Sequence, residues 1–86
     1  MELSNYADMI YKEMTLMYSN CLIKIDNKEL FKASLDGYAI RGYKDAIENA
    51  YNTLLIDKEE AIHLFEVLKD YLEIIYDKFG QYEEEI

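Results

Sequence analysis

The chain lacks the residues that interrupt or cross-link a fold: it has no proline, a single cysteine and only three glycines among 86 residues. Without proline, no position is forced to give up a helical backbone hydrogen bond. One cysteine cannot form an internal disulfide, and a reducing compartment is the simplest environment for such a chain. These absences favour a helical protein over a disulfide-rich secreted one.

Positive charge is scarce too, because nine lysine and arginine residues stand against 18 acidic residues and the formal net charge is −9. Nucleic acid as a direct ligand needs clustered cations, and so does an anionic membrane surface. The charge therefore excludes both classes. It favours as partner a basic protein, or a protein that normally binds nucleic acid.

No hydrophobic run is long enough to cross a bilayer, because the longest uncharged stretch extends only from Met14 to Ile23. The N-terminal segment carries acidic residues where a signal peptide would carry basic ones. We therefore expect a cytoplasmic protein that does not contact membranes.

Helical periodicity is abundant, because apolar residues recur at steps of three and four through most of the chain. The clearest seam is Ala61, Phe65, Leu68, Leu72, Ile75 and Phe79. The pattern predicts an all-α fold, a small antiparallel bundle of three long helices plus a short helix, over about residues 5–22, 27–35, 37–54 and 58–79. These elements form one domain, residues 1–80, followed by an acidic tail, residues 81–86.

Two capping boxes mark predicted helix starts. Asp26 and Glu29 form the first, and Asp57 and Glu60 form the second. In each pair the aspartate accepts from the backbone three residues later, and the glutamate reaches back to the aspartate's backbone N–H. At the other end of the last helix, Gly80 is placed to terminate it in a left-handed conformation.

The stretch between the two boxes is too long for one straight helix, at about 40 Å against roughly 27 and 33 Å for its predicted neighbours. We place a break at Gly37, because glycine is unfavourable inside a helix and Asp36 can cap a new one. A single helix with a kink is the alternative.

Small residues line one face of the helix that follows, at steps of three, four and four: Ala39, Gly42, Ala46 and Ala50. The row predicts a groove in which a neighbouring helix packs closely, so that leucine in place of Gly42 would overpack it. Arg41, the only arginine, is assigned to the solvated side of this helix.

No set of residues has the composition of an active site. Glu60 and His63 have the E-x-x-H spacing of carboxylate-bridged metal sites, but the single histidine cannot complete such a site within one chain. Cys21 lies on the apolar stripe of the first helix, where cysteine is usually an inert small hydrophobe. We predict no enzyme, no metal and no cofactor, and keep a metal-dependent enzyme assembled across a dimer as an alternative.

Two surfaces are candidates for partner binding. One is an acidic ridge along the outside of the last helix, formed by Glu66, Asp70, Glu73 and Asp77. Its charges are about 5–6 Å apart, a spacing comparable to that of DNA phosphates. The other surface is rich in tyrosine and isoleucine, which give contact area at little cost in conformational entropy; it comprises Tyr43, Ile47, Tyr51, Val67 and Ile74.

These features predict a non-catalytic acidic protein that binds and modulates another protein, most readily as an inhibitor, through the tyrosine- and isoleucine-rich surface and the acidic ridge. A DNA-mimic inhibitor of a nucleic-acid-binding protein is the second interpretation. The helix predicted over residues 37–54 has apolar residues around more than half of its circumference, which we call its wide apolar arc. Together with Val67 and Ile74, this arc also predicts a homodimer.

Overall fold

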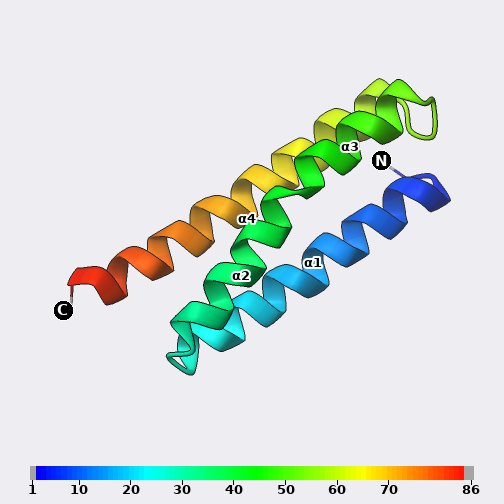
Figure 1. Cartoon of the computed structure of the whole chain (residues 1–86). Coiled ribbons are helices and arrows are strands. Elements are labelled where there is room, and N and C mark those ends of the chain that lie inside the picture. Colours follow the sequence, from blue (N-terminus) through cyan, green and yellow to red (C-terminus); the bar gives the residue numbers. More distant parts are fainter. Residues whose placement is uncertain (1, 85–86) are drawn as a thin grey trace.

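The computed structural model describes residues 2–84, with side chains as far as residue 81. Its helices are α1 (Asn5–Asp26), α2 (Leu30–Arg41), α3 (Tyr43–Asn52) and α4 (Lys58–Glu84) (Figure 1). Residues 2–84 contain no strand, and none of these helices is apolar over enough of its length to cross a membrane. The predicted all-α fold is confirmed.

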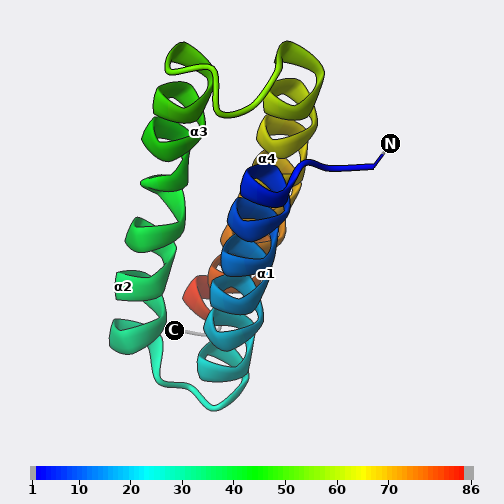
Figure 2. The same ribbon diagram turned by 90° about the vertical axis from the view of Figure 1, so that its right-hand side faces the viewer.

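The helices form an elongated three-helix bundle of 46 × 21 × 16 Å, in which α2 and α3 together make one bent helix. α1 and α4 run in the same direction, and α2–α3 runs antiparallel to both (Figures 1 and 2). α2 packs mostly against α1, whereas α3 packs mostly against α4. The bend thus lets one helix contact each neighbour over a different half of its length.

The core runs the length of the bundle and is almost entirely aliphatic. Its largest fully buried side chains are Met14, Cys21, Ile25, Ile40, Ile47, Leu64 and Ile75. The predicted seam of α4 faces this core, because Ala61, Leu68 and Ile75 are buried and the residues between them pack against it. α1 and α2 meet at small buried residues, where the Cys21 thiol donates to the Ala33 carbonyl at 3.4 Å.

Two helix starts have side-chain caps. Ser4 caps α1, since its hydroxyl accepts from the Ala7 N–H at 3.3 Å. The predicted box at the start of α4 is confirmed: the Glu60 N–H donates to the Asp57 carboxylate at 2.8 Å, and the Asp57 N–H donates to the Glu60 carboxylate at 3.1 Å. Both caps accept hydrogen bonds from backbone N–H groups that have no partner within the first helical turn.

The other predicted capping box is wrong. α1 continues to Asp26, and α2 begins at Leu30 with no side-chain cap. The reason is burial, because Ile25 extends the apolar stripe of α1 by one turn and is fully buried. Asp26 pairs instead with Lys78 of α4 at 3.1 Å.

The predicted break at Gly37 is also wrong, and the alternative of a kinked helix is correct with the kink five residues further on. Gly37 lies inside α2, and Asp36 does not cap a helix, because its carboxylate accepts from Lys24 of α1 at 2.6 Å. The bend occurs at Gly42, whose N–H is shared between the Tyr38 and Ala39 carbonyls at 3.3 and 3.1 Å.

α4 does not end at Gly80 as predicted but continues to Glu84. Gly80 has no positive φ, so it is an ordinary helical residue rather than a left-handed terminator. The glutamine and glutamates that follow are good helix formers, which favours continuation. Only residues 85–86 of the predicted tail lie outside the described residues.

Candidate functional site

The candidate metal-ligating and nucleophilic residues of the sequence are Glu60, His63 and Cys21. Residues 2–81 contain no group of three or more histidine, cysteine or acidic side chains that could hold a metal ion. The thiol of Cys21 is buried in the core, and burial raises its pKa, which favours the unreactive protonated form. His63 is half-buried on α4.

Glu60, the acid of the E-x-x-H pair, joins the start of α4 to the start of α1. Besides closing the capping box, its carboxylate accepts from the Ser4 backbone N–H at 2.6 Å. The hydrogen bond from Ser4, and after it the one from Asp57, lower the pKa of Glu60. Each oxygen of this carboxylate accepts one backbone N–H, so the structure gives Glu60 a role in holding the start of α4.

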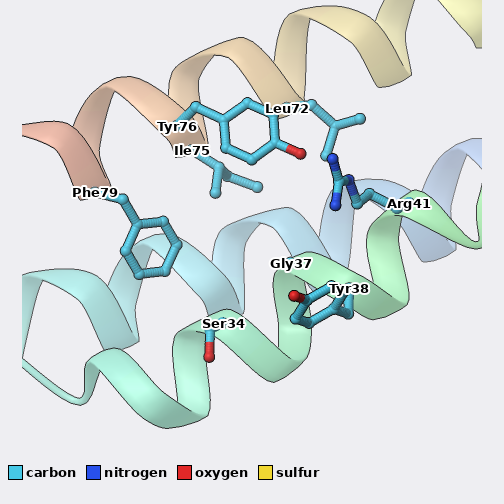
Figure 3. A pocket seen from close by; sticks show the side chains of 8 residues that line it. All are labelled: Ser34, Gly37, Tyr38, Arg41, Leu72, Ile75, Tyr76 and Phe79. Carbon is cyan, nitrogen blue, oxygen red and sulfur yellow. The ribbon is translucent and has the colours of Figure 1, made fainter.

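A concave surface lies between α2–α3 and α4, and we call it the central groove. It consists of two adjoining cavities of about 250 and 430 Å³, which share Arg41, Leu72 and Tyr76 as lining residues. Tyr38, Arg41 and Lys44 form the wall contributed by α2–α3, and Leu68, Leu72 and Tyr76 form the floor and the wall contributed by α4. Figure 3 shows the smaller cavity, which includes Tyr38, Arg41, Leu72 and Tyr76.

Phe65 and Phe79 line opposite ends of the groove. They are 14 positions apart on α4, so the groove is about 21 Å long at 1.5 Å per residue. Leu68 is buried and Leu72 is half-buried, whereas Tyr38 and Tyr76 remain largely exposed on the rim. An apolar floor thus lies below a partly aromatic edge.

Arg41 is the central side chain of this site. Its guanidinium lies 5.4 Å from the centre of the Tyr76 ring and 6.0 Å from that of Tyr38, within the range of cation–π contact. Figure 3 shows the side chain reaching from α2 toward Leu72 and Tyr76 of α4. The residue is exposed, as the sequence predicts, but it lines the groove, which the sequence does not predict.

The charged residues that line the larger cavity are mostly basic, in contrast to the acidic chain as a whole. Arg41, Lys44 and Lys69 line the larger cavity, and Glu73 is the one carboxylate there. Glu73 is 4.0 Å from Lys69, and both side chains are largely exposed, so this pair is weak. No ion pair joins Arg41 or Lys44 to a carboxylate within residues 2–81.

The predicted tyrosine- and isoleucine-rich surface is divided by the fold. Ile47 is fully buried and belongs to the core, so it is not available to a partner. Tyr43 is half-buried, and its pKa is raised by burial and then by the nearby Glu13 carboxylate of α1. Val67 packs against the core, which leaves only Tyr51 and Ile74 of this set exposed.

The predicted small-residue groove is wrong. Ala39, Gly42 and Ala46 are exposed, and Ala50 alone of the row is buried. A Cβ at Gly42 would meet the Ala39 carbonyl oxygen at 3.2 Å, which belongs to the same bent helix and not to a neighbour. Leucine at Gly42 would therefore point toward solvent, and the overpacking predicted from the sequence is not expected.

The acidic ridge lies where the sequence places it. Glu66, Asp70, Glu73 and Asp77 are all exposed on α4. Glu73 at the rim of the central groove is the point at which ridge and groove meet.

Sequence reasoning missed the central groove, although a signal for it exists. Three residues of the α4 seam also belong to a second row at steps of three and four, whose other members are exposed and include one lysine: Ile62, Phe65, Lys69, Leu72, Tyr76 and Phe79. A second row of this kind is typical of a helix with a further neighbour to contact.

Comparisons of the chain with protein-family models, with curated proteins and with solved structures found no match.

Proposed function

We propose that the protein is a non-catalytic binding module that modulates another protein, and that its contact surface is the central groove. The observation that carries the proposal is the apolar floor of Leu68 and Leu72 beneath exposed Tyr38, Tyr76 and Arg41. Tyrosine and arginine are the residues most enriched at the energetic centres of protein interfaces. Grooves between helices commonly receive a helix of the partner.

Site-specific photo-crosslinking tests this proposal, whichever protein the partner is. A photoreactive phenylalanine analogue replaces Tyr38, which is 69 % exposed at the groove, or Leu16, which is 65 % exposed on α1. We expect the same partner protein to be captured from Tyr38 and from a second groove position, Tyr76, but not from Leu16. Equal capture from Leu16 would show that the groove is not the contact surface.

The DNA-mimic interpretation is the second candidate, favoured by the full exposure of the acidic ridge. Its carboxylates recur along one face of α4 with a single weak ion pair, that of Glu73 with Lys69. A partner held by the ridge would be released by duplex DNA and by salt, and it would be lost on joint replacement of Glu66, Asp70 and Asp77 by their amides. A partner held by the groove would tolerate these amide replacements.

A further inference from the structure

We propose that the central groove binds an acidic amphipathic helix of about four turns, with its carboxylates placed against Arg41, Lys44 and Lys69. The inference rests on the proposed function and names the chemistry of the partner. It follows from the contrast between the charge of the groove and the charge of the chain. Acidic residues outnumber basic ones two to one overall, whereas the larger cavity has three cations and one carboxylate.

The basic residues differ in how closely they are paired: Lys32 is 3.6 Å from Glu29, and Lys28 and Lys58 form no ion pair within residues 2–81. Lys12, Lys24 and Lys78 each face a carboxylate of the same chain at 2.6 to 3.1 Å. Within residues 2–81, Arg41 and Lys44 form no such pair, and Lys69 has only Glu73 at 4.0 Å. The groove therefore presents positive charge that the chain itself leaves available, beside an apolar floor that needs a cover.

The dimensions select a helix as the occupant. The groove extends about 21 Å between Phe65 and Phe79, which corresponds to about 14 helical residues. An amphipathic helix places apolar side chains at steps of three and four on the floor, while its flanking positions reach the rim. Glutamates at those flanking positions would meet Arg41 and Lys44 on one wall and Lys69 on the other.

This proposal predicts the opposite of what the net charge predicts. A chain of charge −9 attracts a basic peptide at long range, but at physiological ionic strength such attraction is screened beyond about 8 Å. Contacts inside the groove are closer than that distance. The preference for an acidic helix is therefore expected at physiological salt, where the charges of the groove, and not the net charge of the chain, determine which peptide binds more tightly.

Two synthetic peptides test the proposal by fluorescence anisotropy with the full chain. Each has about 18 residues with leucine at the a and d positions of a heptad, and one has glutamate at the flanking positions where the other has lysine. We expect the acidic peptide to bind about tenfold tighter than the basic one, since each exposed ion pair changes an equilibrium constant by a factor of about 1.5 to 5.

A charge-reversal variant with a matched control locates the binding. Lys44→Glu with Lys69→Glu should abolish or reverse the preference for the acidic peptide. Lys12→Glu with Lys32→Glu changes the net charge equally but lies outside the groove and should preserve the preference. Lys12 and Lys69 are close counterparts, with side chains 74 % and 75 % exposed and each paired with a carboxylate four residues away.

The outcomes separate this inference from the proposed function. Equal or tighter binding of the basic peptide, or equal effects of the two double variants, would overturn the acidic helix while leaving the groove as a contact surface. Binding of neither peptide below about 1 mM would overturn the inference, and the crosslinking experiment would still decide the proposed function. Self-association of the chain that is lost in Lys44→Glu with Lys69→Glu would also overturn it, by showing that a second copy fills the groove.

Discussion

At the scale of single residues, Glu60 shows how one carboxylate connects distant segments. It completes the turn that begins α4 and also accepts from Ser4, the residue that caps α1. Both hydrogen bonds come from backbone amides, and each amide meets a different oxygen of the carboxylate. The starts of α1 and α4 are thereby held together by a side chain that the sequence marks only as a local cap.

Glu60→Gln should lower the free energy of unfolding by about 1–3 kcal/mol, because the amide nitrogen of glutamine would face a backbone N–H and leave that donor unpaired. Urea denaturation measures the loss. The control is Glu59→Gln at the exposed neighbouring position, which should stay within about 0.5 kcal/mol of the parent protein. Equal effects at the two positions would contradict the structural role of Glu60.

Glu60 should also make stability depend on acidity. Its pKa in the folded protein is lowered by the hydrogen bonds from Ser4 and Asp57, so folding favours the ionised form. The resulting stabilisation is present above the unfolded pKa of about 4.5 and is lost as the pH falls through the folded value. The stability difference between the parent and Glu60→Gln should therefore shrink on acidification, as unfolding at neutral and acidic pH would show. A difference independent of pH would refute this linkage.

At the scale of the elements, the bent α2–α3 helix decides which surfaces are covered. Its bend at Gly42 directs α2 onto α1 and α3 onto α4, and the central groove lies along the α4 side. The other two glycines, Gly37 and Gly80, lie inside helices, where an added Cβ would meet nothing within 4 Å. The glycines therefore differ in role, although each is flanked by helical residues.

Gly37→Ala and Gly80→Ala should each raise the free energy of unfolding by about 0.5–1 kcal/mol, because alanine restricts the unfolded chain and fits the helix without strain. Gly42→Ala should raise the free energy of unfolding by less, since its Cβ would approach the Ala39 carbonyl oxygen to 3.2 Å. Thermal unfolding of the three variants measures the order of their stabilities. Destabilisation by Gly37→Ala would show that the helix does break there.

At the scale of the whole molecule, a small core supports an unusually exposed apolar surface. Residues of the outer face of α1, Met9, Leu16 and Ile23, recur every seven positions and are exposed. Their spacing is that of a helix which contacts another helix, and they lie on a different helix from the lining of the central groove. The folded chain thus has more apolar surface than one binding site uses.

Leu68→Ala should cost about 2–5 kcal/mol of unfolding free energy, because Leu68 is only 4 % exposed at the middle of the core and truncation leaves a cavity. Leu35→Ala, at a 54 % exposed position of α2, serves as the control and should cost far less. Chemical denaturation compares the two. A loss below about 1 kcal/mol at Leu68 would indicate that the core closes around the missing side chain.

The homodimer expected from the sequence stays a prediction, and part of its basis has changed. Ile40 and Ile47 of the wide apolar arc are buried within one chain, whereas Ile74 and the α1 row of Met9, Leu16 and Ile23 remain exposed. Light scattering at micromolar concentration should give about twice the monomer mass of 10.2 kDa. Leu16→Glu with Ile23→Glu should return the monomer, and a monomer in the parent chain would exclude the dimer.

The sequence by itself determined the features that depend on neighbours in the chain. The all-α class and the seam of α4 follow from apolar residues spaced three or four positions apart, and the capping box of Asp57 and Glu60 forms within one helical turn. Such interactions do not depend on how the helices are arranged. The buried position of Leu68 could be predicted for the same reason.

The tertiary structure alone decided where the middle helix bends and what covers each face. Asp36 was predicted to cap a helix, but Lys24, twelve residues away, binds it instead. Burial of Ile25 lengthens α1, and α4 turns Leu72 and Tyr76 toward Arg41. These outcomes depend on contacts between helices that are remote in sequence, where burial and pairing outweigh local preferences of about 1 kcal/mol or less.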